Sequence, residues 1–150
     1  KTAYEIRLSL VGSEMCIRDR HGSGQSHVVW SLTEQYLASK NFNVLTIDLP
    51  GHGNSEGKSL KTIEEMSVWL NKVLSKIGVT KLIIVGHSQG CLIALEYFHK
   101  FPDNVVSLIF IAGAYQIPVN KTLIDLSLSG DGESLNLMMN KYHLDCYHHK

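Results

Sequence analysis

Two patterns of hydrophobic and polar residues alternate along this chain, short apolar runs and longer stretches with helical spacing, which predicts strands that alternate with helices. Short apolar runs rich in β-branched residues are typical of buried strands, and they occur at residues 43–47, 81–85 and 105–111. Stretches in which apolar residues recur every three or four positions, as on one face of a helix, occur at residues 26–39 and 62–77, and a third predicted helix covers residues 91–98. The alternation predicts an α/β fold, with a parallel sheet and helices on both of its faces.

Local signals indicate where these helices begin and end. Ser26 is a candidate cap for the first helix. Thr62 and Glu65 form a capping box at the start of the second helix, and Gly78 stands where a helix is expected to stop. The third helix, 91–98, is apolar almost all round, which predicts that it is buried. The apolar face predicted for the first helix consists of Val29, Leu32, Tyr36 and Leu37.

Composition and charge narrow the classes of partner. The chain has 150 residues, 14 basic and 14 acidic side chains, and no apolar run long enough to cross a bilayer. Without a basic excess we expect neither a nucleic-acid nor a membrane partner, and the expected partner is a small-molecule substrate. The three cysteines suggest no disulfide framework, so a cytoplasmic location is the default. Cys146, His148 and His149 match no common zinc pattern, and we expect no metal or other cofactor.

A serine between two glycines follows the second predicted strand. The stretch Gly86-His87-Ser88-Gln89-Gly90 joins that strand to a predicted helix, which is the context that a nucleophile elbow requires. Such an elbow holds its serine in a strained backbone conformation that costs about 1–3 kcal/mol. Gly86 and Gly90 lack the Cβ that would collide where the strand and the helix approach each other. The pattern predicts a nucleophilic Ser88; the alternative is a core strand and helix joined by an ordinary glycine turn.

Two further motifs precede the elbow, and the three together resemble the α/β-hydrolase superfamily. Residues 21–24, His-Gly-Ser-Gly, are similar to that family's oxyanion loop. Residues 48–55, Asp-Leu-Pro-Gly-His-Gly-Asn-Ser, are similar to its D-x-P-G-x-G-x-S loop. The resemblance points to the capped serine-hydrolase branch. It implies a partial α/β-hydrolase core over residues 21–112 and the truncated start of a helical cap over residues 113–150.

The resemblance also implies roles for individual residues. It makes Ser88 the nucleophile, and it assigns the oxyanion hole to the backbone N–H groups of Gln89 and Ser23. Such donors accelerate a reaction because they act on charge that appears only in the transition state. The residues expected to contact the substrate are Gly22, Gly24 and His87.

Neither the catalytic acid nor the catalytic histidine is assignable within the chain. In this family they follow the serine, and the four residues after the strand 105–111 contain no carboxylate. The acid and the histidine are expected downstream of residue 150, since two predicted cap helices, 123–128 and 134–142, bring the chain to its last residue inside the cap. The resemblance makes His21, His52 and Asp48 structural, while His27 and His99 are expected on helix surfaces or edges.

Residues 1–20 are expected to be foreign to the native fold. Residues 10–19, Leu-Val-Gly-Ser-Glu-Met-Cys-Ile-Arg-Asp, look like the translation of a transposon-end sequencing adaptor, and Arg20 is compatible with its last bases. The strand that leads into His21 should be buried and apolar, whereas residues 18–20 are all charged and expensive to bury. We therefore interpret residues 1–20 as an assembly artefact.

The leading hypothesis is a serine hydrolase that acts on an ester, a thioester or a related carbonyl compound through an acyl-enzyme at Ser88. A serine at the elbow argues against the dehalogenases and epoxide hydrolases of the same branch, which use an aspartate there. The chain by itself is expected to have little or no activity. One alternative is a non-catalytic ligand-binding protein on the same fold, because fold does not settle function. A cofactor-free lyase or a peroxidase-like activity is a third.

Overall fold

The computed structural model describes residues 15–18, 26–113 and 121–129. The chain separates into two compact units, one ending at Gln116 and the other beginning at Ile117. In the second unit the structure describes helix α4 (Lys121–Ser129), which contains the first predicted cap helix, 123–128. The second predicted cap helix, 134–142, lies outside the described residues. The division near residue 113 therefore stays a prediction.

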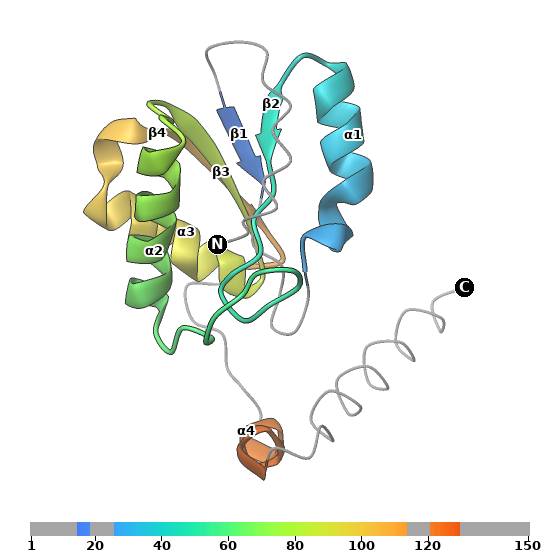
Figure 1. Ribbon diagram of the computed structural model, residues 1–150, viewed down its shortest axis with the longest axis vertical. Helices are drawn as coiled ribbons and strands as arrows, with labels where there is room; N and C mark the ends of the chain where they lie inside the picture. Colours follow the sequence, from blue (N-terminus) through green and yellow to red (C-terminus); the bar gives the residue numbers. More distant parts are fainter. Residues whose placement is uncertain (1–14, 19–25, 114–120, 130–150) are drawn as a thin grey trace. The chain divides into compact units, whose positions relative to one another are not determined.

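Four parallel strands form the sheet of the first unit (Figure 1). They lie in the order β2-β1-β3-β4, and the three neighbouring pairs are all parallel. The strands are β1 (Met15–Arg18), β2 (Asn43–Leu45), β3 (Leu82–His87) and β4 (Val105–Ile111). The predicted parallel sheet is confirmed, and the three predicted strands are β2, β3 and β4.

Strand β1 lies inside the segment that the sequence analysis left out of the fold. Ile17 pairs with Leu45 of β2 on one side and with Ile84 of β3 on the other, so β1 occupies an inner position of the sheet. It includes one of the three charged residues, Arg18. Parallel pairing uses backbone N–H and C=O groups, which any non-proline residue supplies. This pairing does not test whether residues 1–20 derive from an adaptor, so that origin stays a prediction.

The helices cover both faces of the sheet, as predicted. Helix α1 (Ser31–Ser39), preceded by the 3-10 turn η1 (His27–Trp30), lies on one side, and α2 (Ile63–Lys76) and α3 (Gln89–Lys100) lie on the other (Figure 1). A second 3-10 turn, η2 (Pro102–Asn104), leads from α3 into β4. No helix among the described residues is both long and apolar enough to cross a bilayer.

The predicted ends of α2 are confirmed. The Thr62 hydroxyl oxygen accepts a hydrogen bond from the Glu65 N–H at 3.1 Å, and the Glu65 carboxylate accepts one from the Lys61 N–H at 2.8 Å. The return bond thus reaches one residue further back than in the usual capping box. Gly78 follows the last turn with φ +74°, a conformation that glycine adopts readily. Ser26, by contrast, precedes η1 without a side-chain cap hydrogen bond.

The core lies between the sheet and the pair α2 and α3. The buried residues of this cluster are Leu45, Leu70, Leu74, Val79, Leu82, Ile84, Ala94 and Tyr97. The hydroxyl of the buried Tyr97 approaches the amide oxygen of the half-buried Asn71 at 3.1 Å, which satisfies a polar group that would otherwise be costly to bury.

One prediction of burial was wrong, and one predicted apolar face is exposed. Helix α3 was expected to be buried all round, yet Leu95 and Phe98 are 44% and 43% exposed, because α3 packs on α2 and the sheet through its opposite face. The apolar face predicted for α1 is also largely exposed, with Leu32 at 81% and Tyr36 at 61%. An apolar stripe shows that a face suits burial, but it does not determine what covers that face.

Candidate active site

Ser88 stands at the turn between β3, which ends at His87, and α3, which begins at Gln89. Its backbone has φ 53° and ψ −120°, a combination that is sterically disfavoured for a residue with a Cβ. Such outliers cost on the order of 1–3 kcal/mol and persist where the surrounding structure enforces them. The strained turn expected of a nucleophile elbow is therefore present at the predicted serine.

The close approach of strand and helix explains Gly86. A Cβ added there would lie 2.6 Å from the carbonyl carbon and oxygen of Gly90 and 2.7 Å from the Cys91 nitrogen. All three are backbone atoms, which cannot rotate out of the way as a side chain can. Any side chain at position 86 would therefore force α3 away from β3 and displace the turn between them.

Hydrogen bonds to β4 and to the first turn of α3 hold the backbone of this turn. The Ser88 N–H donates to the Ile111 carbonyl of β4 at 3.0 Å, and the Cys91 N–H donates to the Ser88 carbonyl at 3.0 Å. The Cys91 thiol donates to the Gly86 carbonyl at 3.1 Å. Burial raises the pKa of this thiol, which keeps it in the neutral form that donates. The end of β4 and the first turn of α3 thus both fix the backbone of Ser88.

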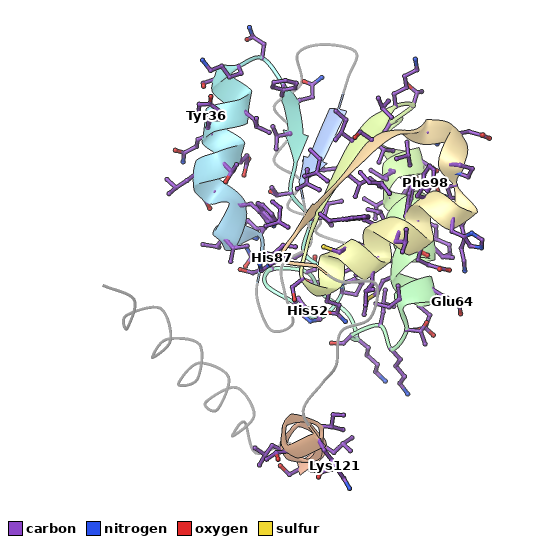
Figure 2. All side chains as sticks on the ribbon, turned by 180° about the vertical axis from the view of Figure 1, so that it is seen from behind. Tyr36, His52, Glu64, His87, Phe98 and Lys121 are labelled. Carbon is purple, nitrogen blue, oxygen red and sulfur yellow. The ribbon has the colours of Figure 1, made fainter. Side chains whose placement is uncertain are left out.

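The residues on either side of Ser88 are partly exposed to solvent. His87, Ser88 and Gln89 are each half-buried, so the serine does not lie in the packed interior. As the first residue of α3, Gln89 carries an N–H that has no acceptor within the helix. The His87 ring stands edge-on to Trp30, with ring centroids 6.3 Å apart. Figure 2 shows His87 at the same end of the sheet as His52 of the 48–55 loop.

The other half of the predicted oxyanion hole lies outside the described residues. This applies to His21 and to the predicted site residues Gly22, Ser23 and Gly24. Their distances from Ser88 therefore stay predictions. The described chain resumes at Ser26, directly before η1.

A buried carboxylate lies in the loop after β2. The side chain of Asp48 has both oxygens engaged: Oδ1 accepts from the His27 N–H at 2.7 Å, and Oδ2 lies 2.7 Å from the His27 ring Nδ1. The Asn54 N–H also donates to Oδ2, at 3.1 Å. Gly53 passes so close that a Cβ there would collide with the carboxylate. Asp48 thus binds both its own loop and the beginning of η1.

The protonation of Asp48 follows from these partners. Burial by itself would raise the pKa of Asp48, but hydrogen bonds from the His27 and Asn54 N–H groups and the charge of His27 outweigh it and hold the pKa below its usual value. Asp48 is therefore the ionised carboxylate in an ion pair with His27 when that ring is protonated.

His27 is the first residue of η1 and so lies at a helix edge, as expected, but its pairing with Asp48 was not predicted. His27 is half-buried and contacts Asp48, a residue 21 positions away. The sequence offered no signal for this contact, because the strand before His27, β1, lies in the segment that the sequence analysis left out of the fold. The structural roles implied for Asp48 and His52 agree with the structure, since the His52 ring approaches the Pro50 carbonyl at 3.1 Å. His99 is exposed on α3, as expected.

The comparisons with known proteins agree with the observed fold. A family model described as alpha/beta hydrolase fold matches residues 21–146. The chain belongs to this family. Among curated relatives, the pimeloyl-[acyl-carrier protein] methyl ester esterase of Proteus mirabilis (strain HI4320) is 35% identical over 94 residues, which is 63% of this chain and 34% of that protein. An uncharacterized protein of Mycobacterium tuberculosis (strain ATCC 25618 / H37Rv) is 29% identical over 137 residues, 90% of this chain and 40% of its own length.

Solved structures show the same α/β-hydrolase fold. An esterase from Exiguobacterium antarcticum matches with a TM-score of 0.74 at 20% identity, over 93% of this chain and 56% of that one. A marine microorganism esterase matches with a TM-score of 0.63 at 25% identity, over 73% of this chain and 41% of that one. The chain spans less than half the length of the curated relatives that it matches.

Proposed function

We propose that this α/β hydrolase, as the complete protein, is a serine hydrolase that cleaves a carboxylic ester, a thioester or a related carbonyl compound through an acyl-enzyme at Ser88. The observation that carries the proposal is the backbone of Ser88, strained at φ 53° and ψ −120° between β3 and the first residue of α3. A strained backbone is retained where function or packing requires that conformation. Here the strained residue is a half-buried serine directly before the first residue of a helix. Relatives named as esterases support the substrate class.

The proposed first step forms one bond and moves one proton. The Ser88 Oγ attacks the carbonyl carbon of the substrate, its proton passes to a base, and the carbonyl oxygen takes the negative charge. When the tetrahedral intermediate collapses, the carbon–oxygen or carbon–sulfur bond breaks and the leaving group receives that proton. Water then attacks the acyl-enzyme in the same way and releases the acid and free Ser88.

The N–H of Gln89 is the proposed donor to the transient oxyanion, together with the N–H of Ser23. The Ser88 N–H is unsuited to this role because it already donates to the Ile111 carbonyl. The Gln89 N–H lies at the positive end of the α3 dipole, which favours negative charge. Removing one such donor typically lowers the rate about 10²–10³-fold.

The base and the acid are not assigned to described residues. The rings of His27 and His52 are engaged with Asp48 and with the Pro50 carbonyl, and His87 packs against Trp30. From the family's chain order of serine, acid and histidine, we propose that both groups lie downstream of residue 150 in the complete protein, and that residues 113–150 begin a cap. Little or no hydrolysis is then expected of the 150-residue chain alone.

The test uses the protein made from the complete reading frame. Wild type should react with a fluorophosphonate at Ser88, identified by mass spectrometry of the labelled peptide, and should hydrolyse p-nitrophenyl esters. Ser88→Ala should remove the label and lower kcat by about 10³-fold or more. Ser75→Ala, an exposed serine near the end of α2, is the matched control and should leave both unchanged. Wild-type protein that binds esters without cleaving them would favour the ligand-binding alternative instead.

A further inference from the structure

The side chain of Cys91 lies between the carboxyl ends of two neighbouring strands. Its thiol donates to the Gly86 carbonyl of β3 at 3.1 Å, and its sulfur lies 3.6 Å from the Ile111 carbonyl of β4. The residue is 4% exposed and belongs to the first turn of α3. One side chain of α3 therefore contacts both strands at the end of the sheet where the chain turns at Ser88.

Gly113 leaves the space that this side chain fills. A Cβ added at Gly113 would collide with the Cys91 sulfur and would lie 2.6 Å from the Cys91 Cβ. It would also lie 3.8 Å from the Ser88 carbonyl oxygen, which is ordinary van der Waals contact. The residues that follow β4 thus pack against Cys91, beside the carbonyl of Ser88.

The backbone of Cys91 holds the peptide unit between Ser88 and Gln89. The Cys91 N–H donates to the Ser88 carbonyl at 3.0 Å, and the Ser88 N–H donates to the same Ile111 carbonyl that the thiol approaches. Because a peptide unit is planar, the direction of the Ser88 carbonyl determines the opposite direction of the Gln89 N–H. The position of Cys91 therefore sets the direction of the proposed oxyanion donor.

We propose that Cys91 is a positioning residue for catalysis: its side chain holds the first turn of α3 against the ends of β3 and β4, and so directs the Gln89 N–H toward the oxyanion. This inference rests on the proposed function. An oxyanion donor acts on charge that is present in the transition state and absent from the bound substrate. A misdirected donor therefore lowers kcat and leaves KM nearly unchanged. Loss of a whole donor lowers the rate about 10²–10³-fold, which is the upper limit for a displaced one.

A purely structural role makes a different prediction. If Cys91 only fills space in the core, replacing it changes the free energy of unfolding but not the turnover of each folded molecule. Ile93→Val provides the comparison, since it removes one buried heavy atom from the same helix, as Cys91→Ala does. Ile93 is 1% exposed and packs with Leu49 and Met66. Turnover per active site is the readout that separates the two roles.

The experiment measures kcat and KM of the complete protein, per site titrated to completion with a fluorophosphonate. Cys91→Ala should lower kcat about 10–100-fold, with KM changed less than about threefold. Cys91→Ser keeps a hydroxyl donor on the Cβ and should retain kcat within about fivefold of wild type. Ile93→Val is the matched control and should keep the wild-type kcat while it lowers the urea midpoint.

Gly113→Ala displaces the same thiol from the side of β4. It should lower kcat about 10-fold or more through its collision with the Cys91 sulfur. Cys91→Gly removes both atoms that obstruct position 113, so adding Gly113→Ala to that background should change kcat less than about twofold. An equal loss from Gly113→Ala in both backgrounds would contradict the proposal, because Gly113 would then act without Cys91.

Two outcomes keep the inference separable from the proposed function. If Ser88→Ala retains hydrolysis, the proposed function fails and the inference fails with it. If Ser88 is required but Cys91→Ala keeps the wild-type kcat per titrated site, the positioning role alone is overturned. Should Cys91→Ala not fold, Cys91→Val fills the space without a donor. In that case Cys91→Val should lower kcat while Cys91→Ser retains it, and equal activity of the two would refute the role.

Discussion

Replacing Gly86 by alanine tests whether the close approach of β3 and α3 is what shapes the turn at Ser88. The new Cβ would lie 2.6 Å from two backbone atoms of Gly90, whereas ordinary contact begins at 3.4 Å. The difference, 3.4 − 2.6 = 0.8 Å, is the separation that the strand and the helix must gain. Overpacking of this kind costs about 1–3 kcal/mol of the free energy of unfolding.

The same displacement acts on the reaction centre, because Ser88 lies between the two elements that separate. A shift approaching 1 Å lowers the rate of a positioned reaction by up to about 10²-fold. We expect Gly86→Ala to lower the urea midpoint, followed by circular dichroism, and to slow fluorophosphonate labelling of Ser88 in the complete protein by about 10–100-fold.

Gly78 provides the matched control, because it separates backbone strain from collision. Gly78 has φ +74° and no heavy atom within 4 Å of an added Cβ. Gly78→Ala should therefore cost about 1 kcal/mol through its backbone conformation alone and leave the labelling rate unchanged. The reasoning would be refuted if Gly86→Ala unfolded at the wild-type midpoint and labelled at the wild-type rate.

Three further predictions concern single contacts of the described residues. Because the pKa of Asp48 is lowered in the folded state, Asp48 stabilises the protein above its unfolded pKa, and this contribution is lost as pH falls through the folded pKa. In Asp48→Asn the free energy of unfolding, measured in urea between about pH 2 and 6, should therefore fall less steeply on acidification than in wild type. Thr62→Ala should lower the free energy of unfolding by about 1 kcal/mol through loss of the α2 cap, whereas Thr80→Ala, at an exposed position, should change it little, as thermal melting would show. Tyr97→Phe should cost about 0.5–1.5 kcal/mol in urea unfolding, because it removes the hydroxyl that contacts the Asn71 amide and leaves the ring in place.

Where the determining interactions are local, the sequence alone predicted the structure correctly. The turn at Ser88 follows from Gly86 and Gly90 between an apolar strand and an apolar helix, and α2 begins and ends at its cap and its glycine. Each of these signals acts within a few residues, through a missing Cβ, a side-chain cap or a positive φ. The α/β fold followed because strands and helices alternate along the chain.

Tertiary structure alone decided which residues meet and which faces are covered. Met15–Arg18 became an inner strand because its backbone pairs on both sides, although its charge argued against a strand. His27 contacts Asp48 across 21 positions because two loops leave the same edge of the sheet. The apolar faces of α1 and α3 look alike in sequence whether or not anything packs on them. Pairing and burial depend on partners distant in the chain, and a local pattern carries no information about those partners.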